Sequence, residues 1–133
     1  MKIYTSAEKA VQAAIAKAEE LNIKITVAIV DDHGTPIMLR RMEGAIPVSP
    51  QFALSKAYTA AAVGLPTTAI AQYAIPGQPL NGITSAMGGK IMVIAGGLTI
   101  KHADIIVGGV GVGGSYDVSQ DLACAQAALE AFE

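Results

Sequence analysis

Hydrophobic and polar residues in the first third of the chain follow a helical period and then an alternating one. Apolar residues recur every three or four positions from residue 7 to residue 21, which predicts an amphipathic helix. Residues 5–8 (TSAE) have the form of a capping box, so the helix is expected to begin there. Alternation then predicts strands over residues 24–30 and 37–42, joined by a hairpin turn at residues 31–34 (DDHG).

Two further helices are predicted from their capping residues. Ser49 followed by Pro50 predicts an N-cap and a first helical residue, and Gly64 predicts the end of that helix. Thr67 is expected to cap a shorter helix that runs as far as Tyr73.

A loop and a second pair of strands are predicted in the last third of the chain. Proline, glycine and asparagine dominate residues 75–82, a composition typical of a loop. Apolar runs predict strands over residues 91–95 and 104–112, with a turn at the two glycines of residues 96–97.

The clearest helix closes the sequence. Apolar residues from 118 to 132 form one stripe, and Asp117 with Gln120 makes an acceptable N-terminal cap. Cys124 lies beside this stripe and is expected to pack as a small hydrophobic residue. The order α-β-β-α-α-β-β-α, with hairpins in place of crossovers, predicts an α+β fold around an antiparallel sheet. We interpret residues 1–133 as one domain.

Charge is distributed unevenly along the chain. From residue 44 to residue 103 there is no acidic side chain, and the charged residues at pH 7, with histidine neutral, are Lys56, Lys90 and Lys101. A soluble monomer normally carries charge of both signs over its whole surface. This stretch is therefore expected to be covered by a membrane, by other copies of the chain or by a large apolar ligand. Because the remaining charges are positive, they favour a ligand with a negative edge.

Several partners are disfavoured by composition. Prolines and polar side chains interrupt the uncharged run, which argues against a transmembrane helix. A pI of about 5.6 and the lack of a basic run argue against nucleic acid. The first residues contain no apolar signal segment, and the single cysteine excludes an internal disulfide, so a cytoplasmic location is expected.

Residues 109–114 (GVGVGG) match the G-x-G-x-x-G pattern of dinucleotide-binding folds. That fold needs a second parallel strand and a ribose-binding acid after the helix, and the sequence leaves no room for them. Two interpretations remain. The amides near Gly111, Gly113 and Gly114 could attract a ligand carboxylate at the helix N-terminus. The glycines could instead let the strand pack against another backbone, and this interpretation is favoured.

The two histidines are candidate metal ligands. His33 lies in the predicted turn beside two aspartates, where it is either a solvated turn residue or an axial ligand or general base. His102 and Asp104 are two positions apart in a predicted extended segment, so their side chains would share one side of it.

Lys56 is the most informative charge. It lies on an alanine-rich predicted helix with no acidic residue near it in the sequence. Its ammonium could reach solvent past the helix, pair with Glu43 through the fold, or bind a ligand carboxylate. Arg41 and Glu43 are the other charges placed to enter the uncharged region.

Short motifs occur along the chain in a specific order. They are Val30-Asp31-x-x-Gly34, Arg41-Met-Glu-Gly-Ala45, Ser49, Lys56-Ala-x-Thr-Ala60, Pro66-Thr67, Gly88-Gly89, Val107-Gly-Gly-Val-Gly-Val-Gly-Gly114, and Asp121, Ala125 and Ala128. With them, almost the whole chain resembles the GlcG/HbpS-like haem-degrading domain family. That family also includes the C-terminal domain of PduO-type corrinoid adenosyltransferases.

The resemblance implies a profilin-like or PAS-like domain with a central antiparallel sheet flanked by helices. It also implies a homo-oligomer, sometimes an octamer, that binds haem or a corrinoid in connection with glycolate, glycerol or diol metabolism. The sequence departs from the family in having Glu43 in place of the usual aspartate and Lys90 in place of a proline after the glycine pair. A third departure is Gly114, near where a serine-glycine pair is common.

Three functions are consistent with these observations. The first is a cytoplasmic, homo-oligomeric haem- or corrinoid-binding accessory of a metabolic enzyme. In this hypothesis His33 or His102 reaches the metal, and the ligand contacts Arg41, Glu43, Lys56, Thr59, Gly111, Gly113 and Gly114. The second is an enzyme acting on haem or a small carboxylate, with Glu43 or His102 as general base. The third is a ligand-free accessory subunit of a metabolic enzyme.

Overall fold

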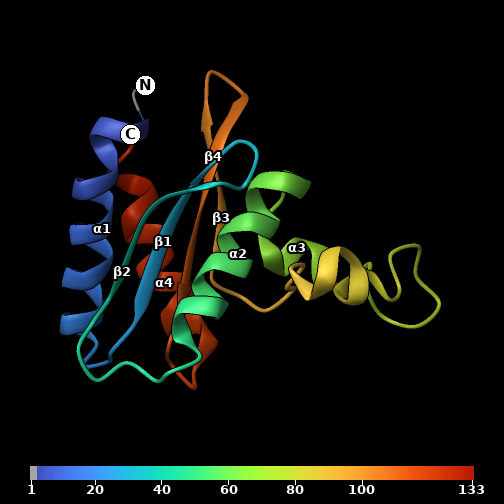
Figure 1. Ribbon diagram of the computed structural model, residues 1–133, viewed down its shortest axis with the longest axis horizontal. Helices are drawn as coiled ribbons and strands as arrows, with labels where there is room; N and C mark the ends of the chain where they lie inside the picture. Colours follow the sequence, from blue (N-terminus) through green and yellow to red (C-terminus); the bar gives the residue numbers. More distant parts are fainter. Residues whose placement is uncertain (1–2) are drawn as a thin grey trace.

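A four-stranded antiparallel sheet, in the order β2-β1-β4-β3, forms the centre of the protein (Figure 1). The structure is a computed structural model and describes residues 3–133. Helices α1 and α4 cover one face of the sheet and α2 covers the other. The elements are α1 (Ile3–Glu20), β1 (Thr26–Asp31), β2 (Pro36–Arg41), α2 (Ser49–Val63), α3 (Thr67–Ala71), the 3₁₀ helix η1 (Ile83–Gly89), β3 (Gly97–His102), β4 (Ile105–Gly113) and α4 (Val118–Glu130).

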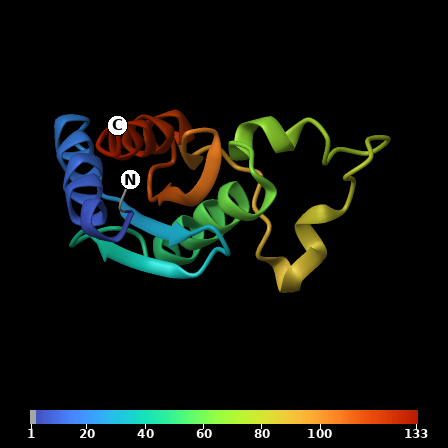
Figure 2. The ribbon, with the colours of Figure 1, turned by 90° about the horizontal axis from the view of Figure 1, so that it is seen from above.

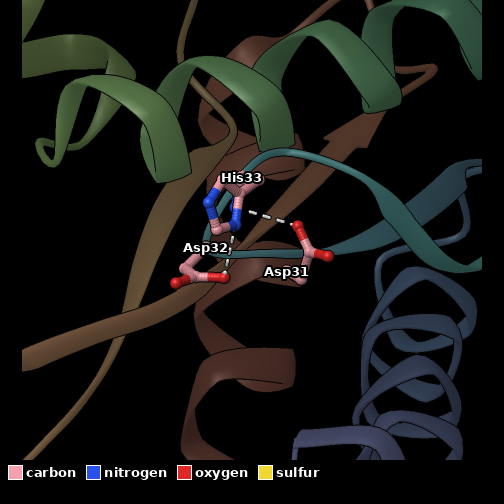
Figure 3. Close-up of side chains that lie close together, drawn as sticks. All are labelled: Asp31, Asp32 and His33. Carbon is pink, nitrogen blue, oxygen red and sulfur yellow. Dashed lines mark hydrogen bonds and ion pairs between the residues drawn. The ribbon is translucent and has the colours of Figure 1, made fainter.

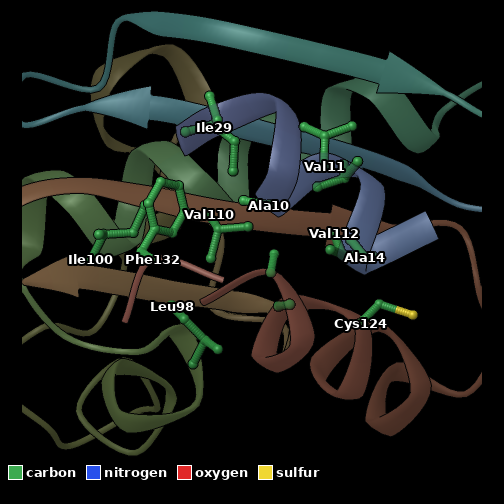
Figure 4. Close-up of a cluster of buried hydrophobic side chains, with 14 of the residues drawn as sticks. Ala10, Val11, Ala14, Ile29, Leu98, Ile100, Val110, Val112, Cys124 and Phe132 are labelled. Carbon is green, nitrogen blue, oxygen red and sulfur yellow. The ribbon is translucent and has the colours of Figure 1, made fainter. Parts of the chain in front are cut away.

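The predicted fold class is confirmed, and the order of helices and strands is as expected apart from the added η1. Strand β1 shows why the sheet is buried on both sides. Val27 and Ile29 pack into the core beneath α1 and α4, drawn in Figure 4, while Ala28 and Val30 pack against α2. Its sequence is therefore a continuous apolar run, as expected for a strand that is covered on both faces.

Strand β4 packs against α2 through backbone contact, and its glycines make this possible. A Cβ added at Gly111 would lie 2.0 Å from the carbonyl oxygen of Ala53, and one at Gly109 would lie 2.4 Å from that of Ala57. Gly111 also pairs with strands on both sides, so its backbone belongs to the sheet. The packing interpretation of the glycine motif is confirmed.

The N-terminal capping of α4 follows the prediction in part. The Asp117 side chain accepts from the Ser119 backbone N–H at 3.1 Å, which confirms Asp117 as the cap. The Gln120 side chain does not complete a capping box, because its Oε1 accepts instead from the Ser115 hydroxyl at 2.6 Å. Val118 lies exposed, so the predicted apolar stripe was wrong at its first position.

Cys124 is fully buried between α4 and α1, which confirms that it packs as a small hydrophobic residue. Removal from water raises the pKa of its thiol to about 11, and the nearby Asp121 carboxylate adds to the shift.

Gly64 ends α2 as predicted, but the other predicted N-terminal caps were wrong. Helix α1 is already formed at Ile3, so Thr5 lies inside its first turn. In α2 the N-cap position is occupied by Val48, and the Ser49 hydroxyl instead bonds the Thr26 hydroxyl at 2.8 Å. Thr67 begins α3, but its Oγ1 accepts from the Gly97 N–H at 3.1 Å. In these two cases a hydroxyl that could have capped a helix joins the helix to the sheet.

The second hairpin lies further along the chain than predicted. Residues 91–95 are irregular, and β3 begins at Gly97, where a turn was expected. The turn of the hairpin contains Ala103 and Asp104, both with positive φ (51° and 64°). Because Asp104 is in this turn, it does not share a side of an extended segment with His102, and that prediction was wrong.

Residues 72–89, which we call the arm, project away from the sheet and its helices (Figures 1 and 2). The arm carries no charged residue. Tyr73, Ile75 and Met87 are 41%, 55% and 64% exposed. None of the helices over residues 3–133 has the length and apolar character needed to cross a bilayer.

Candidate functional site

The structure separates the predicted site residues into three places. His33 and His102 lie at one end of the sheet, since Asp31 pairs with Gly108 and His102 closes β3. Arg41, Glu43, Gly113 and Gly114 lie at or beyond the opposite end. A strand of six residues spans about 20 Å, so one small site cannot include both ends. Lys56 is buried between α2 and the sheet, and Thr59 is buried between α2 and residues 90–92.

Arg41 is the last residue of β2 and Glu43 lies just beyond it, and both are exposed. The Arg41 guanidinium donates to the carbonyl of Ala45 and so holds the loop before α2. Glu43 is exposed in that loop.

Lys56 is an internal residue. Its Nζ donates to the Val112 carbonyl at 2.8 Å and to Asp121 Oδ2 at 3.3 Å, and the Lys56 and Asp121 side chains are 1% and 2% exposed. The hypotheses of a solvent-exposed ammonium and of a pair with Glu43 were therefore wrong. Burial also leaves no room for the predicted ligand carboxylate, because the Lys56 ammonium is enclosed and already has two partners.

Asp121 is the partner that sequence reasoning missed. Burial lowers the pKa of Lys56 and raises that of Asp121, although each charge stabilises the other. Asp121 Oδ1 also accepts from the Ser115 N–H at 3.0 Å, so the pair joins α2, β4 and the start of α4. The available signal was an acid one turn before Cys124 and Ala125 on the buried side of a helix.

Thr59 is fully buried and acts as an anchor for the segment that leaves the arm. Its hydroxyl donates to the Ser55 carbonyl at 2.7 Å, accepts from the Met92 N–H at 2.9 Å and lies 3.4 Å from the Lys90 carbonyl. We also predicted that Thr59 contacts a ligand, but its side chain has no surface exposed to one.

A groove lies between the β1–β2 turn and the outer side of α2, and we call it the hairpin groove. Its volume is about 210 Å³, and it is lined by Gly34, Pro36, Gln51, Leu54, Ser55, Tyr58 and Lys90. Gly34, at φ 81°, allows the turn to lie directly on the Tyr58 ring, since an added Cβ would be 2.3 Å from it. The Lys90 ammonium lies 5.8 Å from the centre of the same ring, within the range of a cation–π contact.

His33 lies in the β1–β2 turn immediately before Gly34, which lines this groove, and Figure 3 shows its side chain together with those of Asp31 and Asp32. Asp31 Oδ1 accepts from the backbone N–H groups of His33 and Thr35, both at 2.9 Å, and these bonds fix the turn. The imidazole Nδ1 lies 3.1 Å from Asp32 Oδ1 in a side chain that is 83% exposed. A carboxylate at Nδ1 favours the tautomer in which Nε2 keeps its lone pair, as in many metal-binding histidines.

A second hollow of about 370 Å³ lies at the opposite end of the sheet, lined by Ile23, Lys24, Gly44, Ile46, Gly114, Ser115, Tyr116, Asp117 and Gln120. Neither histidine is close in sequence to its lining residues, whereas Gly34, the residue after His33, lines the hairpin groove. The Asp117 carboxylate already occupies the N-terminus of α4, so an anion at the glycine amides would meet a negative charge. Among residues 3–133, Asp31, Asp32 and His33 form the group of three side chains that could hold a metal ion together. The hairpin groove is therefore the better candidate site.

The antiparallel sheet between helices defines a small α+β domain of the profilin-like type. Residues 4–130 match the family described as haem degrading protein HbpS-like, and the chain belongs to this family.

Relatives extend this assignment. The corrinoid adenosyltransferase PduO of Salmonella typhimurium is 37% identical over 120 residues, which is 90% of this chain and 35% of PduO. The chain thus spans about a third of the length of that relative. The crystal structure of the Klebsiella pneumoniae protein ORFY superimposes with a TM-score of 0.93 at 32% identity, covering 97% of this chain and 88% of ORFY. A PduOC:haem complex gives a TM-score of 0.92 at 35% identity, covering 96% of this chain and 91% of PduOC.

Proposed function

We propose that this protein binds haem or a corrinoid in the hairpin groove and serves, as a homo-oligomer, as an accessory to a metabolic enzyme. The observation that carries the proposal is the exposed imidazole of His33, which Asp32 orients in the turn whose next residue, Gly34, lines the groove. The family description and the PduOC:haem complex support haem as the ligand, and the name of PduO supports a corrinoid.

The residues of the groove fit a tetrapyrrole. Pro36, Leu54 and Tyr58 offer an apolar and aromatic surface, and His33, the residue before Gly34 in the turn, would offer a nitrogen ligand. When bound, the iron or cobalt would supply redox and ligand-exchange chemistry, while the chain binds and orients the ring. A volume of about 210 Å³ is smaller than usual small-molecule pockets, so one part of the ring would stay outside the groove.

Titration with hemin and with cobalamin tests the binding proposal. We expect the hemin absorption band to shift on binding to the wild-type protein, and His33→Ala to weaken binding by at least about tenfold because the metal loses its protein ligand. His102→Ala is the matched control and is expected to bind as the wild type does. A protein that shifts the spectrum of neither compound would contradict the proposal. Equal binding by His33→Ala would show that a residue other than His33 ligates the metal.

The surface of the arm supports the proposal that the protein is a homo-oligomer. The exposed apolar side chains of the arm and its lack of charge make it suited to contact with another copy, because no charge would need to be desolvated. We expect sedimentation velocity to give a species larger than the 13.6 kDa chain.

A charge placed in the arm tests that contact. Met87→Glu is expected to shift the distribution toward the single chain, since an acid would be buried in the interface. Ala16→Glu places the same charge on the exposed side of α1 and is expected to have no such effect. A wild-type protein that sediments as a single chain at every concentration would contradict the proposal.

Haem breakdown is a second candidate function, favoured by the description of the family. Incubation of the hemin complex with a reductant and oxygen tests it. Loss of the haem absorption with formation of a linear tetrapyrrole would support breakdown, and a stable complex would leave binding as the function.

A further inference from the structure

Lys90 is the cation of the hairpin groove. It lines the groove at the base of the arm and places its ammonium over the Tyr58 ring at 5.8 Å. Within residues 3–133 no carboxylate lies within ion-pair distance of this ammonium. It also lies in the stretch from residue 44 to residue 103 that has no acidic side chain. Its positive charge is therefore available to a bound ligand.

Thr59 fixes the backbone from which Lys90 projects. The buried Thr59 hydroxyl accepts a hydrogen bond from the Met92 N–H at 2.9 Å and lies 3.4 Å from the Lys90 carbonyl oxygen. Thr59 follows Tyr58 in the rigid helix α2, so the same turn of helix supplies the ring and the anchor. Residues 90–92 are irregular, and this buried contact restricts where the ammonium can lie.

We infer that Lys90, positioned by Thr59, makes the hairpin groove selective for tetrapyrroles that carry free carboxylates over tetrapyrroles whose side chains are amidated. The inference rests on the proposed binding function and specifies its ligand class. Haem carries two ionised propionates, whereas the side chains around the ring of a complete corrinoid are amides. An ammonium attracts a carboxylate through full charges, and it attracts an amide only through the weaker amide dipole.

The charges around the groove give the bound ring an orientation. The Asp31 and Asp32 carboxylates lie in the turn beside His33, and they would repel a propionate placed there. The carboxylate edge of the ligand is therefore expected at Lys90, with the apolar part of the ring over Leu54 and Pro36.

Hemin and hemin dimethyl ester provide the test, because they share the ring and the iron and differ in the charge of the two propionates. We expect the wild-type protein to bind hemin about fivefold more tightly than the ester, as for a solvent-accessible ion pair. Lys90→Met should remove this preference and Lys90→Arg should retain it. Lys101→Met, which removes an exposed lysine from β3, is the matched control and should also retain it.

Thr59 is tested by the same ratio of affinities, which a general loss of stability would not change. Thr59→Val should reduce the preference for hemin, and Thr59→Ser, which keeps the hydroxyl, should preserve it. In the Lys90→Met background, Thr59→Val should have no further effect on the ratio. Thermal melts of each variant show that the folded protein is being titrated.

Each outcome decides the inference. Equal binding of hemin and its ester by the wild type, or a preference that persists in Lys90→Met, would overturn the role of Lys90 while leaving the proposed binding function intact. A ratio unchanged in Thr59→Val would overturn the role of Thr59. Failure of the wild type to bind either compound would instead contradict the proposed function itself.

Discussion

Gly111→Ala is expected to lower the free energy of unfolding by about 3 kcal/mol, because the new methyl group would overlap the backbone of α2. Its Cβ would lie 2.0 Å from the Ala53 carbonyl oxygen and 2.5 Å from the Ala57 amide nitrogen. Neither atom belongs to a flexible side chain, so the helix and the sheet would have to separate. Calorimetry at a fixed protein concentration should show a melting temperature lower by about 10 °C.

Gly77→Ala is the control for this experiment. Gly77 has φ 88° and nothing within 4 Å of an added Cβ, so the substitution should cost only the backbone strain of about 1 kcal/mol. If Gly111→Ala were as stable as the wild type, the close packing of α2 on β4 would be contradicted. An alanine in an unobstructed strand would in fact be slightly favourable relative to glycine.

Asp121→Ala is expected to lower the free energy of unfolding by about 3–5 kcal/mol, because it leaves the Lys56 ammonium buried without its charged partner. The same substitution removes the hydrogen bond of 3.0 Å that the Ser115 N–H donates to Asp121 Oδ1. Burial lowers the pKa of Lys56 and raises that of Asp121, so desolvation outweighs attraction for both groups. The pair is therefore costly to break without being a large net source of stability.

A double-mutant cycle separates these effects. Lys56→Met and Asp121→Ala should each be strongly destabilising, and the double variant should lose less than the sum of the two, because no unpaired charge remains. Urea unfolding of the four proteins gives the coupling energy. Additive losses would show that the two side chains do not act as a pair.

The fold could be predicted from the sequence because local signals agreed with it. The period of two in residues 24–30 and 37–42 and the turn chemistry at Gly34 placed the first hairpin correctly. The second hairpin was misplaced because Gly96 and Gly97 were interpreted as a turn. In the structure these glycines allow close approach to α2, since a Cβ at Gly97 would lie 2.5 Å from the Lys56 carbonyl oxygen. Sequence alone does not separate these two uses of glycine.

The candidate site could be predicted only in part. His33 was predicted as a candidate ligand because it lies in a turn beside two aspartates, and it stays a prediction. Lys56 was assigned to a ligand because its true partner lies 65 positions away in the sequence and meets it only through tertiary packing. The hairpin groove joins a turn, a helix and the base of the arm, so Tyr58 and Lys90 could not be grouped with His33 before the fold was known.

The central claim is that the metal of a bound tetrapyrrole lies beside His33 in the hairpin groove. Crystals grown with hemin, measured at the iron absorption edge, locate the metal directly. The account predicts an anomalous peak about 2 Å from His33 Nε2, the usual length of a metal–imidazole bond, with the ring against Tyr58. An iron peak in the hollow beside Tyr116, or at any position away from His33, would contradict it.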